Sequence, residues 1–249
     1  MLEVGDLHAG YGGREIVCGA TFVAHAGETI TVLGANGAGK STLLGAIAGL
    51  VPVTRGRIVI AGRDVAGRPS WEAHDLGIVL LLQAGQVFTS MTVGENLQLA
   101  RTAAWRSSRF DGLQPLVDLL RPLESRRAGL LSGGERQLLA IALALLQQPR
   151  CILLDEPSAN LFPAVARHIS EIIQAYVQAT GSCVVLVEQN ARFALDLATR
   201  VFRMFAGRLS EVTLPKDHDL DDVWRLTFGE WVAGANDERA PHPSQEEAE

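Results

Sequence analysis

A glycine-rich segment at residues 34–42 most strongly limits the folds that this chain can adopt. It has the sequence GANGAGKST, follows an apolar run at residues 29–33, and precedes a helix-like segment at residues 43–50. Small residues let a backbone curl so that several N–H groups face one anion, and the N-terminus of a following helix adds partial positive charge. The order of strand, glycine-rich loop and helix therefore predicts a phosphate-binding loop in an α/β fold, rather than a merely flexible turn.

The same segment carries the side chains that phosphate chemistry needs. We expect Lys40 to reach the outer phosphates of a nucleotide and Ser41 to offer its hydroxyl to Mg²⁺. Lys40 is one of only two lysines in a chain that otherwise uses arginine, which indicates that a compact ammonium is required there. The other residues of the predicted phosphate cradle are Gly34, Asn36, Gly37, Gly39 and Thr42.

Composition argues against several other classes of protein. A net charge of −6 and a pI near 5.6 leave no broad basic stripe, so nucleic acid is not an expected partner. Apolar runs such as residues 78–82 are far below the roughly 20 residues needed to span a bilayer. The first six residues show no basic segment followed by an apolar core, so we expect no export signal and a cytoplasmic location. The three cysteines are expected to be small core residues.

The order of apolar patterns predicts a mixed α/β architecture. Strand-like runs open the chain at residues 2–7, 16–23, 29–33 and 57–60. Between residues 69 and 148 the pattern becomes mostly helical, with helix-like segments at 92–101, 113–120 and 135–147. Strand-like and helix-like segments then alternate, at 151–154, 164–179, 183–187 and 191–198, as is typical of a parallel sheet with covering helices. Residues 201–205 and 209–214 predict a closing hairpin.

The C-terminal region divides into two expected parts. Residues 216–236 hold Trp224, Phe228 and Trp231 among charged residues, which predicts an amphipathic extension. Residues 237–249 contain five acidic residues against one arginine and lack large apolar residues, so we expect this tail to be disordered.

A second chemical motif ends the strand-like run at residues 151–154. An acid at the carboxyl end of a buried strand lies at the edge where open α/β sheets bind ligands. We therefore expect Asp155 to hold Mg²⁺ and Glu156 to orient or deprotonate a water that attacks the γ-phosphate. Apolar strands that end in acids are common, so this motif gains weight only beside the phosphate loop.

A third motif, LSGGERQ at residues 131–137, precedes the Asp155 strand. Ser132 can cap the helix that follows, and Gly133 and Gly134 expose N–H groups at its positive end, which predicts a second anion site. With all three motifs in this order, the chain resembles ATP-binding cassette (ABC) ATPases over about residues 2–212. The resemblance implies a P-loop NTPase fold over residues 1–215, with an N-terminal antiparallel β-subdomain and a helical insertion at about residues 84–148 that carries LSGGERQ.

The resemblance also implies ligands and residue roles. It implies ATP and Mg²⁺ as ligands and ATP hydrolysis coupled to transmembrane transport. Tyr11 would stack on adenine, and Gln83 would reach Mg²⁺ and the attacking water. Ser132 and Gly134 would complete the nucleotide site of a second ABC ATPase subunit, in a homodimer or heterodimer. A surface turn remains the alternative explanation for Tyr11, and an ordinary polar strand end the alternative for Gln83.

Two positions, Gln189 and Asn160, depart from the general ABC pattern and bear on the subfamily. Gln189 stands where most members carry a histidine that contacts the γ-phosphate, and a glutamine can donate a hydrogen bond but cannot become cationic. The runs LVEQNA at residues 186–191 and MTVGENL at 91–97 nevertheless resemble ATPase subunits of branched-chain amino acid importers. This resemblance implies membrane permease subunits as partners, an extracytoplasmic solute-binding protein as an indirect one, and a peripheral place on the inner face of the cell membrane.

Three alternatives remain open. The first is the ATPase of an exporter or lipid transporter. The second is a soluble, non-transport ABC ATPase, which usually has a long coiled-coil insertion or two cassettes per chain, and this sequence shows neither. The third is a mainly regulatory ATP-binding subunit, because Gln189, Leu143 and Asn160 all depart from the family pattern.

Overall fold

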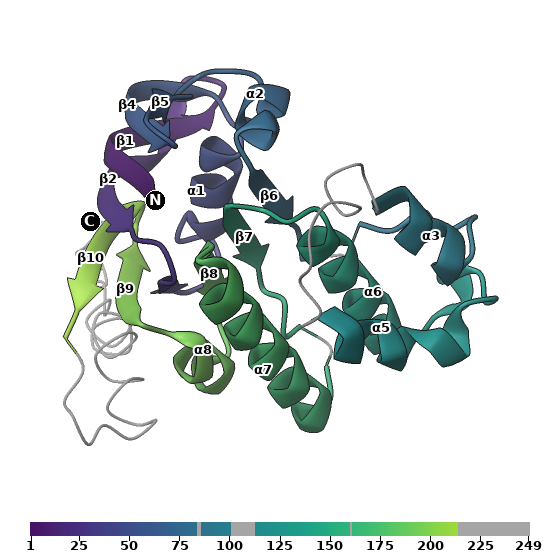
Figure 1. Ribbon diagram of the computed structural model, residues 1–249. Helices are drawn as coiled ribbons and strands as arrows, with labels where there is room; N and C mark the ends of the chain where they lie inside the picture. The colour runs from purple at the N-terminus through teal and green to yellow at the C-terminus, as the bar shows by residue number, and fades with distance from the viewer. Residues whose placement is uncertain (84–85, 101–112, 160, 214–249) are drawn as a thin grey trace, which may run out of the picture.

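Two sheets organise the part of the chain that the computed structural model describes, namely residues 1–83, 86–100, 113–159 and 161–213 (Figure 1). The antiparallel sheet has the order β2 (Arg14–Ala24), β1 (Leu2–Tyr11), β4 (Val53–Ile60), β5 (Arg63–Asp64). The second sheet has the order β10 (Arg208–Val212), β9 (Arg200–Phe205), β3 (Thr29–Leu33), β8 (Cys183–Glu188), β7 (Cys151–Asp155), β6 (Ile78–Leu81). The predicted extension at 216–236, the tail at 237–249 and Asn160 lie outside the described residues.

The second sheet is parallel except at its edge. β9, β3, β8, β7 and β6 pair in parallel, and β10 turns back against β9 as the predicted closing hairpin. The register sets Leu33 of β3 opposite Glu188 of β8, and Asp155 of β7 opposite Val187. Because the carboxyl ends of parallel strands meet at one edge, the loops that follow β3, β7 and β8 lie side by side.

Helices cover both faces of this sheet (Figure 1). Their bounds are α1 (Lys40–Ile47), α2 (Ser70–Asp75), α3 (Val93–Ala100), α5 (Gln114–Leu120), α6 (Gly133–Leu146), α7 (Pro163–Thr180) and α8 (Ala191–Leu197), with short 3₁₀ turns at Arg121–Leu123 and Ala128–Leu130. The predicted helical segments are confirmed with ends shifted by a few residues. None of the described helices combines the length and apolar character needed to cross a bilayer.

Alternation along β7 and β8 divides the core into two layers. Cys151, Leu153 and the equivalent residues of β8 face α1 and the antiparallel sheet. Ile152, Leu154 and their β8 neighbours face the other way, toward α3, α5, α6 and α7. Side chains of a strand alternate between faces, so a continuous apolar run buries both. Leu143 of α6 is half-buried and packs against this second layer.

Within the described part of residues 69–148, where the sequence predicts mostly helices, the structure contains one strand. β6 pairs with β7 and extends the parallel sheet, with Ile78 opposite Cys151. It brings its carboxyl end, and thus Gln83, to the same edge as the loops that follow β7 and β8. The described helices of the predicted insertion, α3, α5 and α6, follow β6 along the chain.

Candidate functional site

The loop at residues 34–42 joins β3 to α1 and has a backbone that glycine makes accessible. Gly37 and Gly39 have φ angles of 77° and 107°, a region that other residues rarely adopt. A Cβ atom on Gly34 would lie 2.4 Å from the carbonyl oxygen of Met204, so β9 approaches too closely for any side chain there. The loop therefore curls tightly over the end of the sheet, with its last glycine at the N-terminus of α1.

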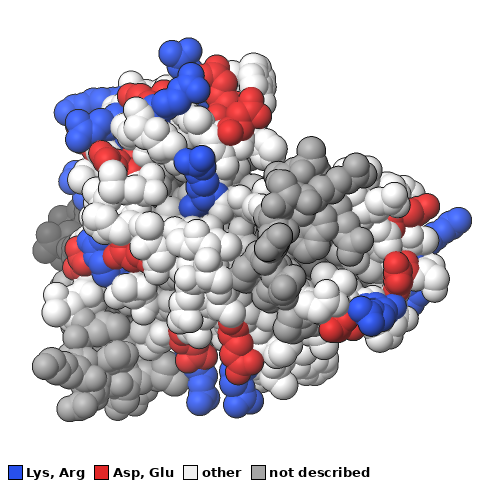
Figure 2. Space-filling view, in the orientation of Figure 1, with Lys and Arg blue, Asp and Glu red and all other residues white. Residues whose placement is uncertain are grey.

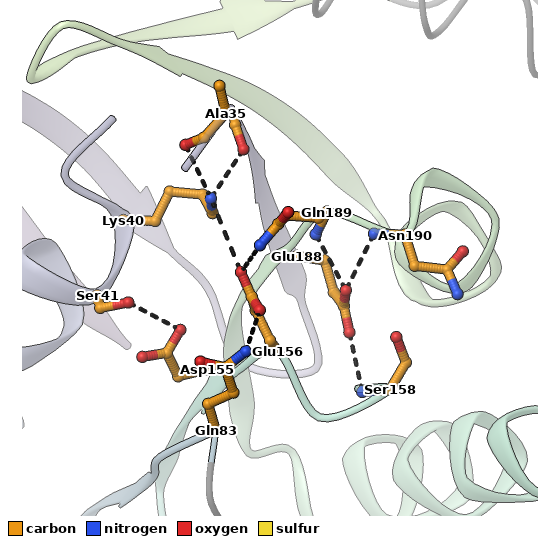
Figure 3. A network of polar contacts seen from close by, with 11 residues as sticks. Ala35, Lys40, Ser41, Gln83, Asp155, Glu156, Ser158, Glu188, Gln189 and Asn190 are labelled. Carbon is orange, nitrogen blue, oxygen red and sulfur yellow. Dashed lines mark hydrogen bonds and ion pairs between the residues drawn. The ribbon is translucent and has the colours of Figure 1, made fainter. Parts of the chain in front are cut away.

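Lys40 is buried beneath this loop. Its Nζ donates to the carbonyl oxygens of Gly34 at 2.7 Å and Ala35 at 3.1 Å, and lies 3.9 Å from Oε1 of Glu156 (Figure 3). Burial lowers the pKa of Lys40, although nearby carboxylates, Glu156 foremost, oppose that effect. An ammonium has three N–H donors, and two are used here, so the group retains a donor and much of its charge for an anionic ligand. This environment fits a phosphate.

Ser41 and Asp155 place two oxygen atoms together at the start of α1. The Ser41 hydroxyl donates to Oδ1 of Asp155 at 3.1 Å, and Asp155 is buried at the end of β7. Burial raises the pKa of Asp155. Hydroxyl and carboxylate oxygens are hard ligands of the kind that Mg²⁺ prefers beside phosphate oxygens, so this pair fits the expected cation.

Glu156 lies at the centre of a network that joins three loops (Figure 3). Gln83 Nε2 donates to its Oε2 at 2.6 Å, and Gln189 Nε2 donates to its Oε1. The backbone N–H of Glu156 donates to the carbonyl oxygen of Val187 at 2.9 Å. Its φ of 47° is left-handed, a conformation that costs a residue with a Cβ atom on the order of 1–3 kcal/mol. Both carboxylate oxygens are thus held in one orientation by amide groups.

These residues surround a hollow of about 530 Å³, a size typical of small-molecule sites. Its lining consists of Tyr11, Ile16, Asn36, Gly37, Gly39, Lys40, Ser41, Thr42, Gln83, Glu156 and Gln189. Tyr11 is 56% exposed at the end of β1, where its ring is free to contact a ligand. Gly34 and Asp155 are outside the lining but bond to Lys40 and Ser41. The structure therefore brings together the predicted residues of the phosphate loop, Gln83, Glu156 and Gln189.

Ile16 is the lining residue that sequence analysis missed. It follows the tight turn at Gly12 and Gly13, which pairs Tyr11 with Arg14. The carbonyl oxygen of Ile16 would lie 3.2 Å from a Cβ atom on Gly39, so β2 contacts the phosphate loop directly. The register pairs Tyr11 with Arg14 and Gly10 with Glu15 and then shifts, so that Ala9 pairs with Val17 and Ile16 falls at the irregularity, which the sequence pattern does not predict.

The third sequence motif lies outside this lining. Ser132 caps α6, since its hydroxyl accepts from the N–H of Glu135 at 3.3 Å while Glu135 Oε2 accepts from the N–H of Ser132 at 2.7 Å. Among the described residues, a Cβ atom on Gly134 would meet only Leu161, at 3.6 Å, an ordinary contact distance. Ser132 and Gly134 therefore lie at the N-terminus of α6, outside the residues that line the hollow of the same chain.

Comparisons with known proteins agree with this geometry. A family model described as "ABC transporter" matches residues 18–159. The chain is 36% identical to the high-affinity branched-chain amino acid transport ATP-binding protein BraG of Pseudomonas aeruginosa, over 84% of this chain and 91% of that protein. It is also 36% identical to the Fe(3+) ions import ATP-binding protein FbpC of Streptomyces avermitilis, over 90% of this chain and 64% of that protein.

Solved structures show the same fold. The ATP-binding subunit of an ABC transporter is 27% identical and superposes with a TM-score of 0.76, covering 95% of this chain and 99% of that one. The family model spans more than half of the chain and includes the phosphate loop and Asp155. The chain therefore belongs to the ABC transporter family, as an ATP-binding ATPase cassette whose usual cation is Mg²⁺.

Proposed function

We propose that this chain is the ATP-hydrolysing subunit of a membrane importer for branched-chain amino acids or related small polar solutes. The choice of solute rests on how much of each relative's length this chain covers. The chain covers 91% of BraG but 64% of FbpC, so about a third of the iron-import protein has no counterpart here. The LVEQNA run at residues 186–191 supports the same class.

Iron import is the second candidate. The identity to FbpC equals the identity to BraG, at 36% for each. The lining of the hollow does not separate the two candidates, since the roles predicted for its residues concern ATP, Mg²⁺ and water rather than a transported solute. The solute is therefore assigned by the length argument, and a transport measurement decides between the two.

The proposed chemistry assigns each group in the hollow a task. Lys40 and the backbone N–H groups of the loop bind the outer phosphates, while Tyr11 stacks on adenine. Ser41 and Asp155 supply oxygens for Mg²⁺. When bound, Mg²⁺ neutralises phosphate charge and holds the β and γ phosphates in place.

Glu156 is proposed to accept a proton from the attacking water. A carboxylate has about four lone-pair sites, and the amides of Gln83 and Gln189 use two, so capacity remains for a water molecule. A base held in one orientation before the reaction needs little rearrangement as charge develops. Gln189 donates a hydrogen bond near the γ-phosphate but supplies no positive charge.

We propose that the chain works as one of two cassettes. Ser132 and Gly134 lie outside the lining of the hollow on their own chain, so their exposed helix N-terminus is available to the nucleotide of a second subunit. Permease subunits would anchor the pair to the inner face of the cell membrane, and an extracytoplasmic solute-binding protein would deliver the solute.

On the face seen in Figure 2, acidic and basic side chains are interspersed, with basic groups gathered at the top over the antiparallel sheet.

Co-purification from native membranes tests this proposal. An affinity-tagged Glu156→Gln chain is extracted in mild detergent with ATP, and its partners are identified by mass spectrometry. We expect polytopic permease subunits with a second cassette, whereas soluble partners alone would contradict a transport role. Uptake of labelled leucine and of Fe³⁺ is then compared in cells with and without the chain. Loss of leucine uptake supports the amino-acid class, and loss of iron uptake alone replaces it with the second candidate.

A further inference from the structure

Glu188, the last residue of β8, is a buried carboxylate that receives three backbone N–H groups. It is 2% exposed. Its Oε1 accepts from the N–H of Ser158 at 2.9 Å, and its Oε2 accepts from those of Gln189 at 3.0 Å and Asn190 at 3.1 Å (Figure 3). Charge-assisted bonds of this kind are stronger than those between neutral groups. Burial raises the pKa of Glu188, and the hydrogen bonds from Ser158, Asn190 and Gln189 oppose that effect.

The three donors belong to two different loops. Ser158 lies two residues after Glu156, in the loop that follows β7, whereas Gln189 and Asn190 follow β8. The side chain of Asn190 also caps α8 by accepting from the N–H of Phe193 at 3.2 Å. One carboxylate thus ties the loop that carries Glu156 to the loop that carries Gln189 and to the start of a helix.

We propose that Glu188 is a positioning residue for ATP hydrolysis, which binds the backbones of Ser158 and Gln189 and so keeps the Gln189 amide against the carboxylate of Glu156. Glu188 does not line the hollow, and it acts through the two residues that do. The inference rests on the proposed roles of Glu156 and Gln189. It deepens them by naming the group that sets their separation.

A carboxylate is required because its two oxygens accept from three N–H donors and it donates to none. Glu188→Gln has the same shape but replaces one oxygen with an NH₂ group, which is itself a donor. Either Ser158 or the pair formed by Gln189 and Asn190 then faces another donor. The substitution therefore separates the two loops without opening a cavity.

The test is a double-mutant cycle in the full chain, alone and with the permease subunits that co-purify with it. For Glu188→Gln we expect ATP affinity within about twofold of wild type and a kcat about tenfold lower, since small displacements of reacting groups are costly. If Glu188 acts through Gln189, adding Glu188→Gln to Gln189→Ala lowers kcat by less than about twofold. Full kcat in Glu188→Gln, or effects that multiply in the double variant, would overturn the inference.

Glu28→Gln is the matched control. Glu28 is also buried, at 8% exposed, and accepts from the backbone N–H of His25 at 2.8 Å, but it precedes β3 at the opposite end of the sheet. We expect it to change thermal stability and not kcat. If Glu188→Gln does not fold, Glu188→Asp replaces it in the same double-mutant cycle with Gln189→Ala. Aspartate keeps both carboxylate oxygens on a side chain that is one carbon shorter. Normal turnover in Glu156→Gln would overturn the proposed role of Glu156, whereas multiplying effects of Glu188 and Gln189 would overturn only this inference.

Discussion

Glu156 has a strained backbone conformation and a side chain whose two carboxylate oxygens both accept hydrogen bonds. Its left-handed φ of 47° turns the chain sharply after β7, and the bond from its N–H to Val187 holds that turn. The turn aims the carboxylate at the hollow, between the amides of Gln83 and Gln189. Strain of this kind persists where surrounding contacts over-determine the conformation, as is common at functional sites.

Replacing this carboxylate separates binding from turnover. Glu156→Gln keeps the size of the side chain but cannot accept a proton from water, so we expect unchanged ATP affinity and a kcat lower by at least about 100-fold. Steady-state ADP release and an equilibrium ATP-binding assay measure the two quantities. Asp75→Asn, at an exposed acid of α2, is the control and should retain wild-type turnover. Hydrolysis at the wild-type rate in Glu156→Gln would remove Glu156 from the mechanism.

Residues of the site differ in how far the sequence predicts them. Lys40 and Ser41 follow from a local motif, because strand, loop and helix are consecutive. Gln83 and Gln189 come from separate strands, and only the order of β6, β7 and β8 in the sheet brings their amides to Glu156. Glu188 gives no local signal, since its partners are backbone N–H groups of another loop. An acid at the end of an apolar strand looks the same whether it faces the ligand or the interior.

At the scale of elements, the periodicity of apolar residues predicted whether a segment is a helix or a strand better than it predicted where that segment begins and ends. The runs at β7 and β8 are continuous because both faces are buried, which the sequence shows directly. α6 begins at Gly133 rather than near Glu135, because the reciprocal bonds of Ser132 and Glu135 satisfy its first turn. β6 has only four residues, and its place in a mostly helical region is fixed by pairing with β7, a contact distant in sequence.

The start of α3 depends on one buried amide. Asn96 is 1% exposed, and it donates to the carbonyl oxygens of Phe88 at 3.0 Å and Thr92 at 2.8 Å while accepting from the N–H of Phe88 at 2.8 Å. Asn96→Ala removes the acceptor of the Phe88 N–H, whereas the carbonyl oxygens of Phe88 and Thr92 keep the backbone bonds from Met91 and Asn96, so we expect the free energy of unfolding to fall by about 2 kcal/mol. Urea denaturation of the wild-type protein and the variant measures this free energy of unfolding. Gln98→Ala, on the exposed face of α3, should change it by less than about 0.5 kcal/mol, and an equal loss in both variants would contradict this account.

The antiparallel sheet carries a pH-dependent contribution. His8 of β1 has Nδ1 3.1 Å from Glu15 of β2 and Nε2 3.2 Å from Asp6, which also pairs with Arg55 of β4 at 2.6 Å. The hydrogen bond to Glu15, with help from Asp6, raises the pKa of His8 above its ordinary 6.5. A raised histidine pKa stabilises the fold fully below the ordinary value, and this stabilisation is lost as pH rises through the folded value.

His8→Gln tests this dependence. We expect the wild-type advantage in Tm over His8→Gln to be larger at about pH 5.5 than at about pH 8.5, because only the protonated ring attracts both carboxylates. Thermal unfolding of both proteins across that range measures it. His168→Gln, at an exposed histidine with a single carboxylate neighbour, serves as the control. An advantage that grows toward high pH would reverse the sign and contradict the assignment.

At the scale of the whole molecule, the hollow and the N-terminus of α6 are separate places on one chain, and both are proposed to bind phosphate groups. The proposed dimer makes use of that separation, because each chain would offer α6 to the nucleotide of the other. Gly134→Ala distinguishes this arrangement from a purely structural role for the glycine. Within the part of one chain that the structure describes, the added methyl group meets only Leu161, at an ordinary contact distance of 3.6 Å, so folding and ATP binding should persist.

Across the proposed dimer the same methyl group would stand between the backbone N–H groups of α6 and a phosphate. We therefore expect the Glu156→Gln chain to dimerise with ATP, and the Glu156→Gln, Gly134→Ala double variant to remain monomeric while binding ATP with unchanged affinity. Light scattering coupled to size-exclusion chromatography, with and without ATP, measures both states. A dimer that persists in the double variant would assign Ser132 and Gly134 to capping α6 alone, because a site that grips a partner's phosphate through its backbone cannot accept a side chain in the path of that phosphate.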